Sequence, residues 1–429
     1  MKHHVIRSLA SCALAACFGS GPAPTTATNA QIVFAPPLPS SDERCNGGSL
    51  YIGDVAIVNG MGFAATLPYV PNNCNGNGSS PTGMASIYSF PLDGSSPDGM
   101  MAASLGQLQT NGGNGLPRVG VGPMGPVWLY SSGNGNGNGG NLSFGPNGGM
   151  LNYEPSGQTG NNPISATPLA IGTASNSSLF IAGSQSGGTS DPNAPQYPCC
   201  GNQGAQAQNV FEAPLPTMST SVMTMNNLTT FGAEMKAPFV ADPSGHIYYA
   251  ASPSSGVQIS EVTAGGMSAT QTPGPGIIVV GLAATDQEVV WSVAVNATAS
   301  QGLQPGCWIY SSTTGSLAQT NMIFQSGRLS CMDVAIDGPA AYFAIVDTEP
   351  QPNCDSCQPT MHGLGIGRVG ISGPLTDGTP FDSIALDLGD TTPGPRRVFA
   401  DNGSIYAIDP FAVVKISEGE LNNAHDIAQ

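Results

Sequence analysis

The sequence predicts an all-β protein, a β-propeller for which seven four-stranded blades are favoured. Three observations lead to this prediction. A pair of apolar runs recurs along the chain, an aromatic residue stands near the centre of the second run, and the copies are spaced by about the length of one blade. A single four-stranded sheet cannot bury both of its faces alone, whereas sheets packed in a closed ring bury them against one another.

Each copy of the repeat is an apolar run, a tight polar or glycine turn, and a second apolar run. The clearest copies are residues 237–252, 331–347 and 396–409, and the weaker ones are 54–67, 117–133, 168–184 and 279–295. The aligned aromatic residues are Phe63, Trp128, Phe180, Tyr248, Trp291, Tyr342 and Tyr406. An aromatic ring with small or β-branched neighbours suits a second strand that packs between adjacent sheets.

A third run with the alternation of a strand follows most copies, and a fourth is visible in several. The third runs are 85–94, 208–216, 256–262, 307–315, 363–371 and 413–419, and one fourth run is 381–389. Four strands per copy are therefore expected. A β-sandwich or a right-handed solenoid is the alternative, but these folds need non-repeating strands or a shorter and stricter period.

The composition agrees with one repetitive domain. The 429 residues exceed the usual size of a single compact core, and the content of Gly 58 and Pro 37 fits many short strands joined by turns. The formal net charge of −17 favours solubility and repels polyanions. We therefore expect no nucleic acid among the partners.

The N-terminus has the layout of a secretory signal peptide. Lys2 and Arg7 precede an apolar stretch, residues 8–16, that is too short to span a bilayer. The segment Leu14-Ala15-Ala16-Cys17 resembles the lipobox of bacterial lipoproteins, which implies lipidation at Cys17. Ordinary cleavage, for instance after Ala30, is the alternative. Both readings place the chain outside the cytoplasm, as a cell-envelope lipoprotein or a secreted protein.

The expected organisation is a signal at 1–17, a flexible tether with a candidate closing strand at 18–45, and the propeller at 46–429. A ring of blades closes when a strand from one terminus completes the blade at the other. QIVFA, residues 31–35, is favoured for this role over AHDIAQ, residues 424–429.

Eight cysteines follow Cys12 and Cys17, and an even number in an exported chain predicts disulfides. They are Cys45, Cys74, Cys199, Cys200, Cys307, Cys331, Cys354 and Cys357. In the register of the repeat, the longest insertions lie between second and third strands, so these cysteines gather on one face. Local geometry suggests the pairs Cys45 with Cys74, Cys307 with Cys331, and Cys354 with Cys357, which leaves Cys199 and Cys200 as an adjacent pair. Each disulfide would limit the unfolded freedom of its loop by about 2–4 kcal/mol.

No constellation in the sequence points to a catalytic site, and no metal site is expected. Cys354, Cys357 and His362 have the residue types of a zinc or redox site, but one CxxC pair is a weak signal and a disulfide is favoured. His246 stands in the turn before a strand, where an ordinary exposed histidine is favoured. The glycine-rich run at 133–140 lacks the lysine of a phosphate-binding loop.

Acidic residues recur near the turns that join strands. They include Asp242, Asp337, Asp347 and Asp401. Asp in such places caps a turn through its own backbone. No cofactor is expected, although acidic turns repeated around a ring make Ca²⁺ the cation to consider.

The repeat resembles that of the NHL and YWTD propeller families, in the form of a secreted bacterial lipoprotein. The best matches are Val240-Ala241-Asp242, Ile247-Tyr248-Tyr249-Ala250, Ile87 to Gly94, and Phe399-Ala400-Asp401. The resemblance spans about residues 50–420 and implies the fold only. Several copies lack the Asp after the first run and have much longer loops, so no ligand of these families is carried over.

These observations favour a non-enzymatic, monomeric binding module that presents disulfide-stapled loops to a protein, peptide or glycan. Its membrane contact is expected only through the lipid anchor. One alternative is a propeller enzyme, a lyase or hydrolase, in which His246 or Glu261 reaches the central channel. Another is a structural surface lipoprotein without a discrete ligand. The fold alone does not distinguish these functions, so the choice depends on the residues that the fold brings together.

Overall fold

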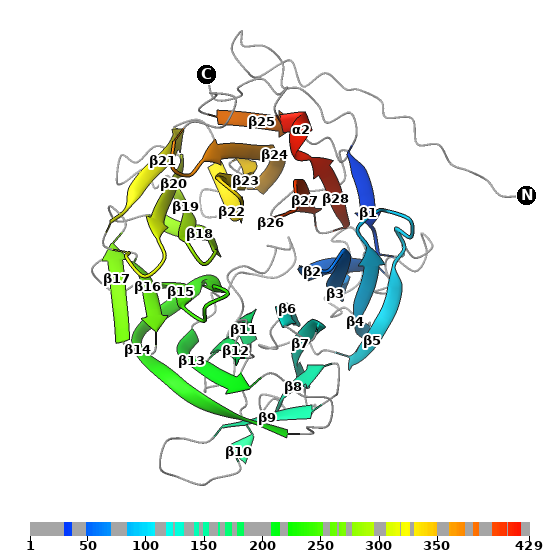
Figure 1. The fold of residues 1–429 in the computed structure, drawn as a ribbon. Coiled ribbons are helices and arrows are strands. Elements are labelled where there is room, and N and C mark those ends of the chain that lie inside the picture. Colours follow the sequence, from blue (N-terminus) through cyan, green and yellow to red (C-terminus); the bar gives the residue numbers. More distant parts are fainter. Residues whose placement is uncertain are drawn as a thin grey trace, which may run out of the picture.

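The computed structural model is all-β, and its described residues form five sheets arranged around a common centre (Figure 1). The described residues are 30–36, 49–69, 84–107, 117–122, 125–132, 141–145, 149–153, 162–163, 168–173, 178–183, 207–214, 222–251, 258–263, 266–271, 277–295, 306–317, 319–326, 330–349, 360–373, 381–385, 397–409 and 411–421. The predicted propeller arrangement is confirmed. Counted as hydrogen-bonded sheets, its units number five.

Four of the sheets have four antiparallel strands in the order expected for a blade. The first is β2(Ser49–Val58), β3(Met61–Tyr69), β4(Met84–Pro91) and β5(Met100–Gln107). The next two are β18(Ile277–Ala284), β19(Glu288–Val295), β20(Cys307–Thr313), β21(Asn321–Ser326), and β22(Ser330–Asp337), β23(Ala340–Glu349), β24(Thr360–Gly370), β25(Phe381–Ala385). The closing blade is β26(Arg397–Asp401), β27(Ser404–Asp409), β28(Ala412–Ser417) and β1(Gln31–Phe34), with the short helix α2(Glu418–Leu421) after β28.

The fifth sheet has twelve strands, and we call it the large sheet. Its strands are β6(Arg118–Gly122), β7(Gly125–Ser132), β8(Asn141–Gly145), β9(Gly149–Tyr153), β10(Asn162–Pro163), β11(Pro168–Thr173), β12(Ser178–Gly183), β13(Ala207–Pro214), β14(Val222–Ala241), β15(Ile247–Ala251), β16(Gln258–Thr263) and β17(Gly266–Gln271). Its pairings follow three runs of four strands, β6 to β9, β11 to β14 and β14 to β17. The 20-residue strand β14 belongs to two runs, and its first residues pair in parallel with β9.

The ring is closed by the N-terminal strand. β1 pairs antiparallel with β28, so Gln31 lies opposite Lys415 in the last blade of the chain. The favoured segment at 31–35 therefore supplies the completing strand, while the competing segment at 424–429 lies outside the described residues. The backbone N–H of Ala35 also donates to the carbonyl of Pro97, 2.8 Å away, which ties the closing blade to the β2–β5 blade.

The aligned aromatic residues all lie on second strands, as predicted, and they share one register. Tyr248 on β15 lies opposite Glu261, Trp291 on β19 opposite Tyr310, and Tyr342 on β23 opposite Arg368. The other aromatic residues and their third-strand partners are Phe63 with Ser89, Trp128 with Gly145, Phe180 with Glu212, and Tyr406 with Lys415. Gly145 is required where it stands, because a Cβ there would lie 1.7 Å from the Trp128 indole nitrogen.

The core lies between neighbouring sheets rather than within one of them. Tyr248 and Ile259 of the large sheet pack with Val289 and Trp291 of the β18–β21 blade. The same holds between the β22–β25 blade and the closing blade, where Tyr342 packs with residues of β27 and β28. This confirms that the second-strand aromatic ring is packed between sheets, and burial of that apolar surface is what holds the ring together.

The two ends of the ring differ in the connections that they carry. First and second strands are joined by short turns, such as 59–60, 285–287, 338–339 and 402–403. Second and third strands are joined at the opposite end by the long segments 70–83, 184–206, 296–306 and 350–359. The longest segment, 184–206, joins a second to a third strand as predicted, but the segments 35–48 and 386–396, which join one blade to the next, are longer than 350–359, so the prediction is confirmed only in part. Among the described residues, no helix has the length and apolar character needed to cross a membrane.

Candidate functional site

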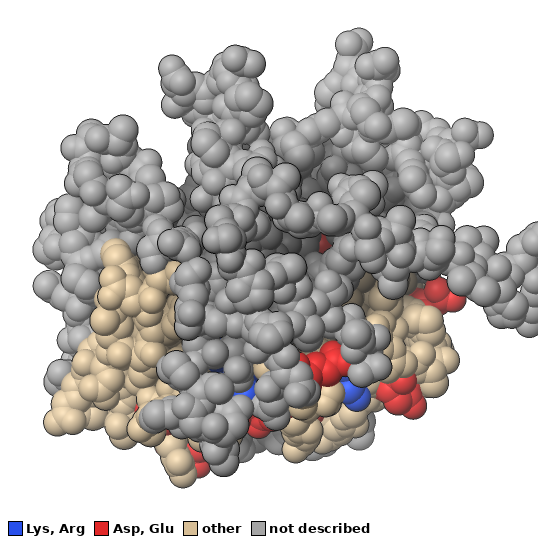
Figure 2. All heavy atoms as spheres, turned by 90° about the horizontal axis from the view of Figure 1, so that it is seen from above, with Lys and Arg blue, Asp and Glu red and all other residues tan. Residues whose placement is uncertain are grey.

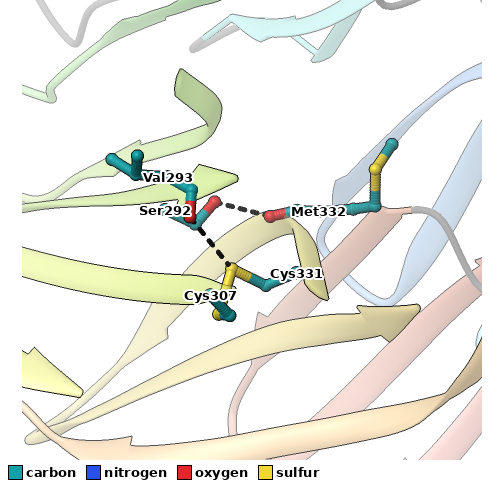
Figure 3. The surroundings of a disulfide bond; sticks show 5 residues. All are labelled: Ser292, Val293, Cys307, Cys331 and Met332. Atoms are coloured by element: carbon teal, nitrogen blue, oxygen red, sulfur yellow. Dashed lines mark hydrogen bonds between the residues drawn. A yellow bond between two sulfur atoms is a disulfide. The ribbon is translucent and has the colours of Figure 1, made fainter. Parts of the chain in front are cut away.

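The end of the ring that carries the long connections is joined across two blades by a disulfide. Cys307 begins β20 and Cys331 follows the first residue of β22, and the bond between them is the one predicted (Figure 3). Their Cα atoms are 5.1 Å apart and both side chains are fully buried. The carbonyl oxygen of Val293 lies 3.7 Å from Sγ of Cys331. The disulfide therefore fixes the start of a third strand to the first strand of the next blade.

The same two blades approach each other closely next to the disulfide. The hydroxyl of Ser292 donates to the carbonyl of Met332, 2.5 Å away (Figure 3). A Cβ on Gly281 would lie 2.6 Å from the backbone nitrogen of Val334. Gly281 stands at a register irregularity of β18, and the missing side chain leaves room for the neighbouring backbone.

Charged residues form a network between neighbouring first strands, and it begins on β22, the strand that carries Cys331. Asp54 of β2 accepts the backbone N–H of Val119 on β6, 2.9 Å away, and a guanidinium N–H of Arg397. Asp333 of β22 accepts Nε of Arg397 at 3.5 Å and the backbone N–H of Val398 at 3.4 Å. We call these contacts of Asp54, Asp333 and Arg397 the carboxylate–arginine network. It links the β22–β25 blade, the closing blade, the β2–β5 blade and the large sheet.

Burial and charge act in opposite directions in this network. Burial raises the pKa of Asp333, and Arg397 opposes that rise without cancelling it. Burial would lower the pKa of Arg397, but the two carboxylates outweigh it and raise that pKa. The Arg397 side chain is 34% exposed and that of Asp54 is 7% exposed. The arginine therefore stays charged and pairs with both carboxylates.

A pair of short motifs in the sequence indicates this network, although the repeat pattern does not include it. The tetrapeptide Asp-Val-Ala-Ile occurs at 54–57 and at 333–336, and each copy is followed in the next unit by Arg-Val, at 118–119 and 397–398. Each Asp accepts the backbone N–H of the Val in the next unit. The recurrence of this pair of motifs marks a contact between neighbouring units.

A second cluster joins His246 to two buried carboxylates. Nδ1 of His246 lies 3.0 Å from Oδ2 of Asp242 and 3.7 Å from Oε1 of Glu261. The two carboxylate side chains are 0% and 3% exposed, whereas that of His246 is 33% exposed. The sequence favoured an ordinary exposed histidine, but its Nδ1 faces this acidic pair.

Tyr248 ties the cluster to the next blade. Its hydroxyl donates to Glu261, 3.2 Å away, and accepts the backbone N–H of Gly315 in the β20–β21 connection. Burial raises the pKa of Tyr248, and the charge of Glu261 raises it further. The cluster thus lies between the large sheet and the β18–β21 blade, at the end with the short turns. His246 and Glu261 do come together, although this place on a third strand differs from the central channel that the enzyme hypothesis named.

The acidic turns have mixed roles. Asp242 accepts the backbone N–H of His246 at 2.9 Å and so caps its own turn, as predicted. Asp337 instead accepts the backbone N–H of Gly403 in the neighbouring blade.

Seen from the edge of the ring, acidic side chains gather along one side of the described surface with a few basic ones beside them (Figure 2). Across the described ranges, no three His, Cys, Asp or Glu side chains group in a way that would hold a metal ion.

The remaining predicted site residues lie outside the described residues. They are Cys17, Cys45, Cys74, Cys199, Cys200, Cys354 and Cys357. His362 lies on β24 and Asp347 on β23, where the two are register partners. The structure thus places one of the predicted disulfides and leaves the others as predictions.

The comparisons with known proteins add no family. No family model matches the chain, and no curated protein matches it. The chain is similar in structure to a puromycin-hydrolyzing peptidase of Mycobacterium tuberculosis, at 10% identity and a TM-score of 0.47, covering 94% of this chain and 56% of that one. It is also similar to an acylaminoacyl peptidase of Pyrococcus horikoshii, at 9% identity and a TM-score of 0.46, covering 89% of this chain and 54% of that one.

A third similar structure is prolyl oligopeptidase B of Galerina marginata, at 10% identity and a TM-score of 0.45, covering 83% of this chain and 45% of that one. The chain spans about half the length of these enzymes. At such scores the likeness carries no argument about activity. The fold assignment rests on the strand pairings alone.

Proposed function

We propose that the protein is an exported, non-enzymatic β-propeller whose long connections bind a protein, a peptide or a glycan. The observation that carries this proposal is the difference between the two ends of the ring: short turns at one end, and the four long connections at the other. Loops held by a rigid scaffold are where binding residues concentrate. The disulfide between Cys307 and Cys331 supports it, because it fixes the base of this end across two blades.

The finer features of the proposal are seven blades, export and a lipid anchor. The three four-strand runs of the large sheet support a count of seven, since β14 serves as the last strand of one run and the first of the next. The buried disulfide supports an oxidising compartment. Lipidation at Cys17 rests on the lipobox-like segment alone.

The test compares variants at the two ends of the ring. In the first, residues 350–359 are replaced by a Gly-Ser segment of equal length. In the control, Asp286→Ala and Gln287→Ala change the exposed β18–β19 turn at the opposite end. Binding is measured by cross-linking and capture from the cell envelope and on arrays of glycans and peptides. We expect loss of binding only in the first variant, and equal retention by both would overturn the proposal.

A second candidate function is acid–base catalysis at His246. The supporting observation is the contact of its Nδ1 with Asp242, because such a carboxylate orients an imidazole and leaves Nε2 as the base. The expected result for this candidate is hydrolysis of model esters or peptides that His246→Ala abolishes while thermal stability stays the same. Equal rates of hydrolysis by wild type and His246→Ala would exclude this candidate function.

A further inference from the structure

Methionine recurs near the start of the outermost strands. The second residue is Met in the fourth strand of the β2–β5 blade, of the β18–β21 blade, and of each four-strand run in the large sheet. These residues are Met101 on β5, Met150 on β9, Met223 on β14, Met267 on β17 and Met322 on β21. The equivalent residue is Ile32 in the closing blade and Asp382 in the β22–β25 blade. We call Met100, Met101 and Met322, whose side chains the structure describes, the methionine rim.

The side chains of the methionine rim are exposed. Met100 is 71% exposed, Met101 is 56% exposed and Met322 is 55% exposed. Ile32 is 51% exposed, and these four are the large hydrophobic residues that stand exposed among the described side chains. Met101 lies opposite Tyr88 and Met322 opposite Tyr310, so a methionine–tyrosine pair occurs in both blades, one register position apart.

The spacing of these methionines limits what they do. The exposed methionines of β5 and β21 stand on separate blades of the ring (Figure 1), so one small ligand would not contact both strands. The chemistry has to be one that a single thioether performs alone. Ile32 shows that the position accepts an apolar side chain without sulfur. What methionine adds there is a thioether that oxidants reach from solvent.

We propose that the methionine rim is a sacrificial oxidation site for hypochlorous acid and related two-electron oxidants. The sulfur gives up two electrons and gains one oxygen to become the sulfoxide. The chlorine of hypochlorous acid is reduced to chloride, and the proton of its hydroxyl group is released. Because the rim side chains are more than half exposed, a polar sulfoxide there removes little packing. This inference is independent of the binding function proposed above.

Met332 is the matched internal control. It packs against the core between the β22–β25 blade and the closing blade, and its carbonyl accepts the Ser292 hydroxyl. A sulfoxide in that place would put a polar group into an apolar contact, which destabilises the fold. The rim is therefore expected to react first and harmlessly, whereas oxidation of Met332 is expected to be slow and damaging.

The experiment treats the full chain with limiting hypochlorous acid and follows each methionine by peptide mass spectrometry. We expect Met100, Met101 and Met322 to oxidise about tenfold faster than Met332, with no change in Tm until the rim is consumed. Comparable rates for Met332, or a fall in Tm that tracks rim oxidation, would overturn the proposal.

A variant tests the protective role directly. Met100→Leu, Met101→Ile and Met322→Ile copy the apolar side chain that Ile32 provides, so the fold should be retained. In this variant the same dose of oxidant should oxidise more Met332 and lower Tm further than in wild type. Equal damage in the two proteins would overturn the protective role. If the triple variant folds poorly, Met322→Ile alone should show a smaller increase in Met332 oxidation, and no increase counts against the proposal.

Discussion

Neighbouring units are joined by different means at two places in the ring. Between the β18–β21 and β22–β25 blades, Gly281 allows close backbone contact and the Cys307–Cys331 disulfide fixes it. Between the β22–β25 blade, the closing blade and the β2–β5 blade, the carboxylate–arginine network makes the contact. Gly281, Asp54 and Asp333 each lie at the register irregularity of their own first strand. The fold therefore requires close contact between units at this position, but the contact is made by a disulfide in one place and by charged side chains in the other. Each kind of contact should be weakened by a different change.

The largest expected effect is loss of the disulfide. Cys307→Ser with Cys331→Ser opens a covalent loop whose ends are 24 residues apart in the sequence. Loop-closure entropy predicts a loss of about 3 kcal/mol in the free energy of unfolding, measured by urea denaturation. The comparison with reduced wild type controls for the serine hydroxyls. An unchanged midpoint would show that the contact is held by packing alone.

A smaller loss is expected for Gly281→Ala. The new Cβ would lie 2.6 Å from the nitrogen of Val334 and 2.7 Å from Cα of Asp333, so the next blade has to move. Overpacking of this kind costs about 2 to 3 kcal/mol, which urea denaturation measures. Gly419→Ala is the control, because its Cβ would lie 3.6 Å from its nearest neighbour, the Ser417 hydroxyl. If both variants unfold at the same midpoint, the close contact is not a constraint.

Removal of the arginine tests the ionic contact. Arg397→Met leaves Asp54 and Asp333 without their shared cation, and we expect a loss of about 2 kcal/mol, less than for a fully buried pair because a third of the arginine is exposed. Burial already raises the pKa of Asp333, and loss of Arg397 raises it further. A carboxyl with a raised folded pKa favours the folded state as pH falls.

The deficit of Arg397→Met should therefore shrink between pH 7 and pH 5, whereas that of Gly281→Ala should not change. Urea denaturation at both pH values measures the two deficits. A pH-independent deficit in the arginine variant would show that the guanidinium acts by packing rather than by charge.

The smallest effect concerns alkaline pH. Burial raises the pKa of Tyr249 to about 12, and its side chain is 1% exposed. The unfolded chain loses this proton near pH 10 while the folded chain keeps it, so stability is full below about pH 10 and falls as pH rises toward 12. Tyr249→Phe should remove about 1 kcal/mol of the loss seen at pH 11, measured by urea denaturation. If the free energy of unfolding of the variant fell with pH as steeply as that of wild type, groups other than Tyr249 would cause the alkaline loss of stability.

The repeat was predictable because its aromatic residue keeps one register on every second strand, from Phe63 to Tyr406. The large sheet was not predictable, because no turn signal in the sequence separates the two runs that share the continuous strand β14. The contact between Asp54 and Arg397 joins residues 343 apart, and nothing local indicates such a pair. The acidic surroundings of His246 depend in the same way on the register that brings Tyr248 opposite Glu261.

The closing strand has a mechanical consequence. Any pull on the chain ahead of residue 31 reaches β1 first, and β1 is held to β28 by ladder hydrogen bonds. At the end where such a load enters, the Gln31 side chain donates to the carbonyl of Asp93 and Lys415 to that of Leu92. Tension on the N-terminus would thus be shared between the first and last blades, and resistance to stretching would be set by four residues of β1 rather than by the remainder of the ring.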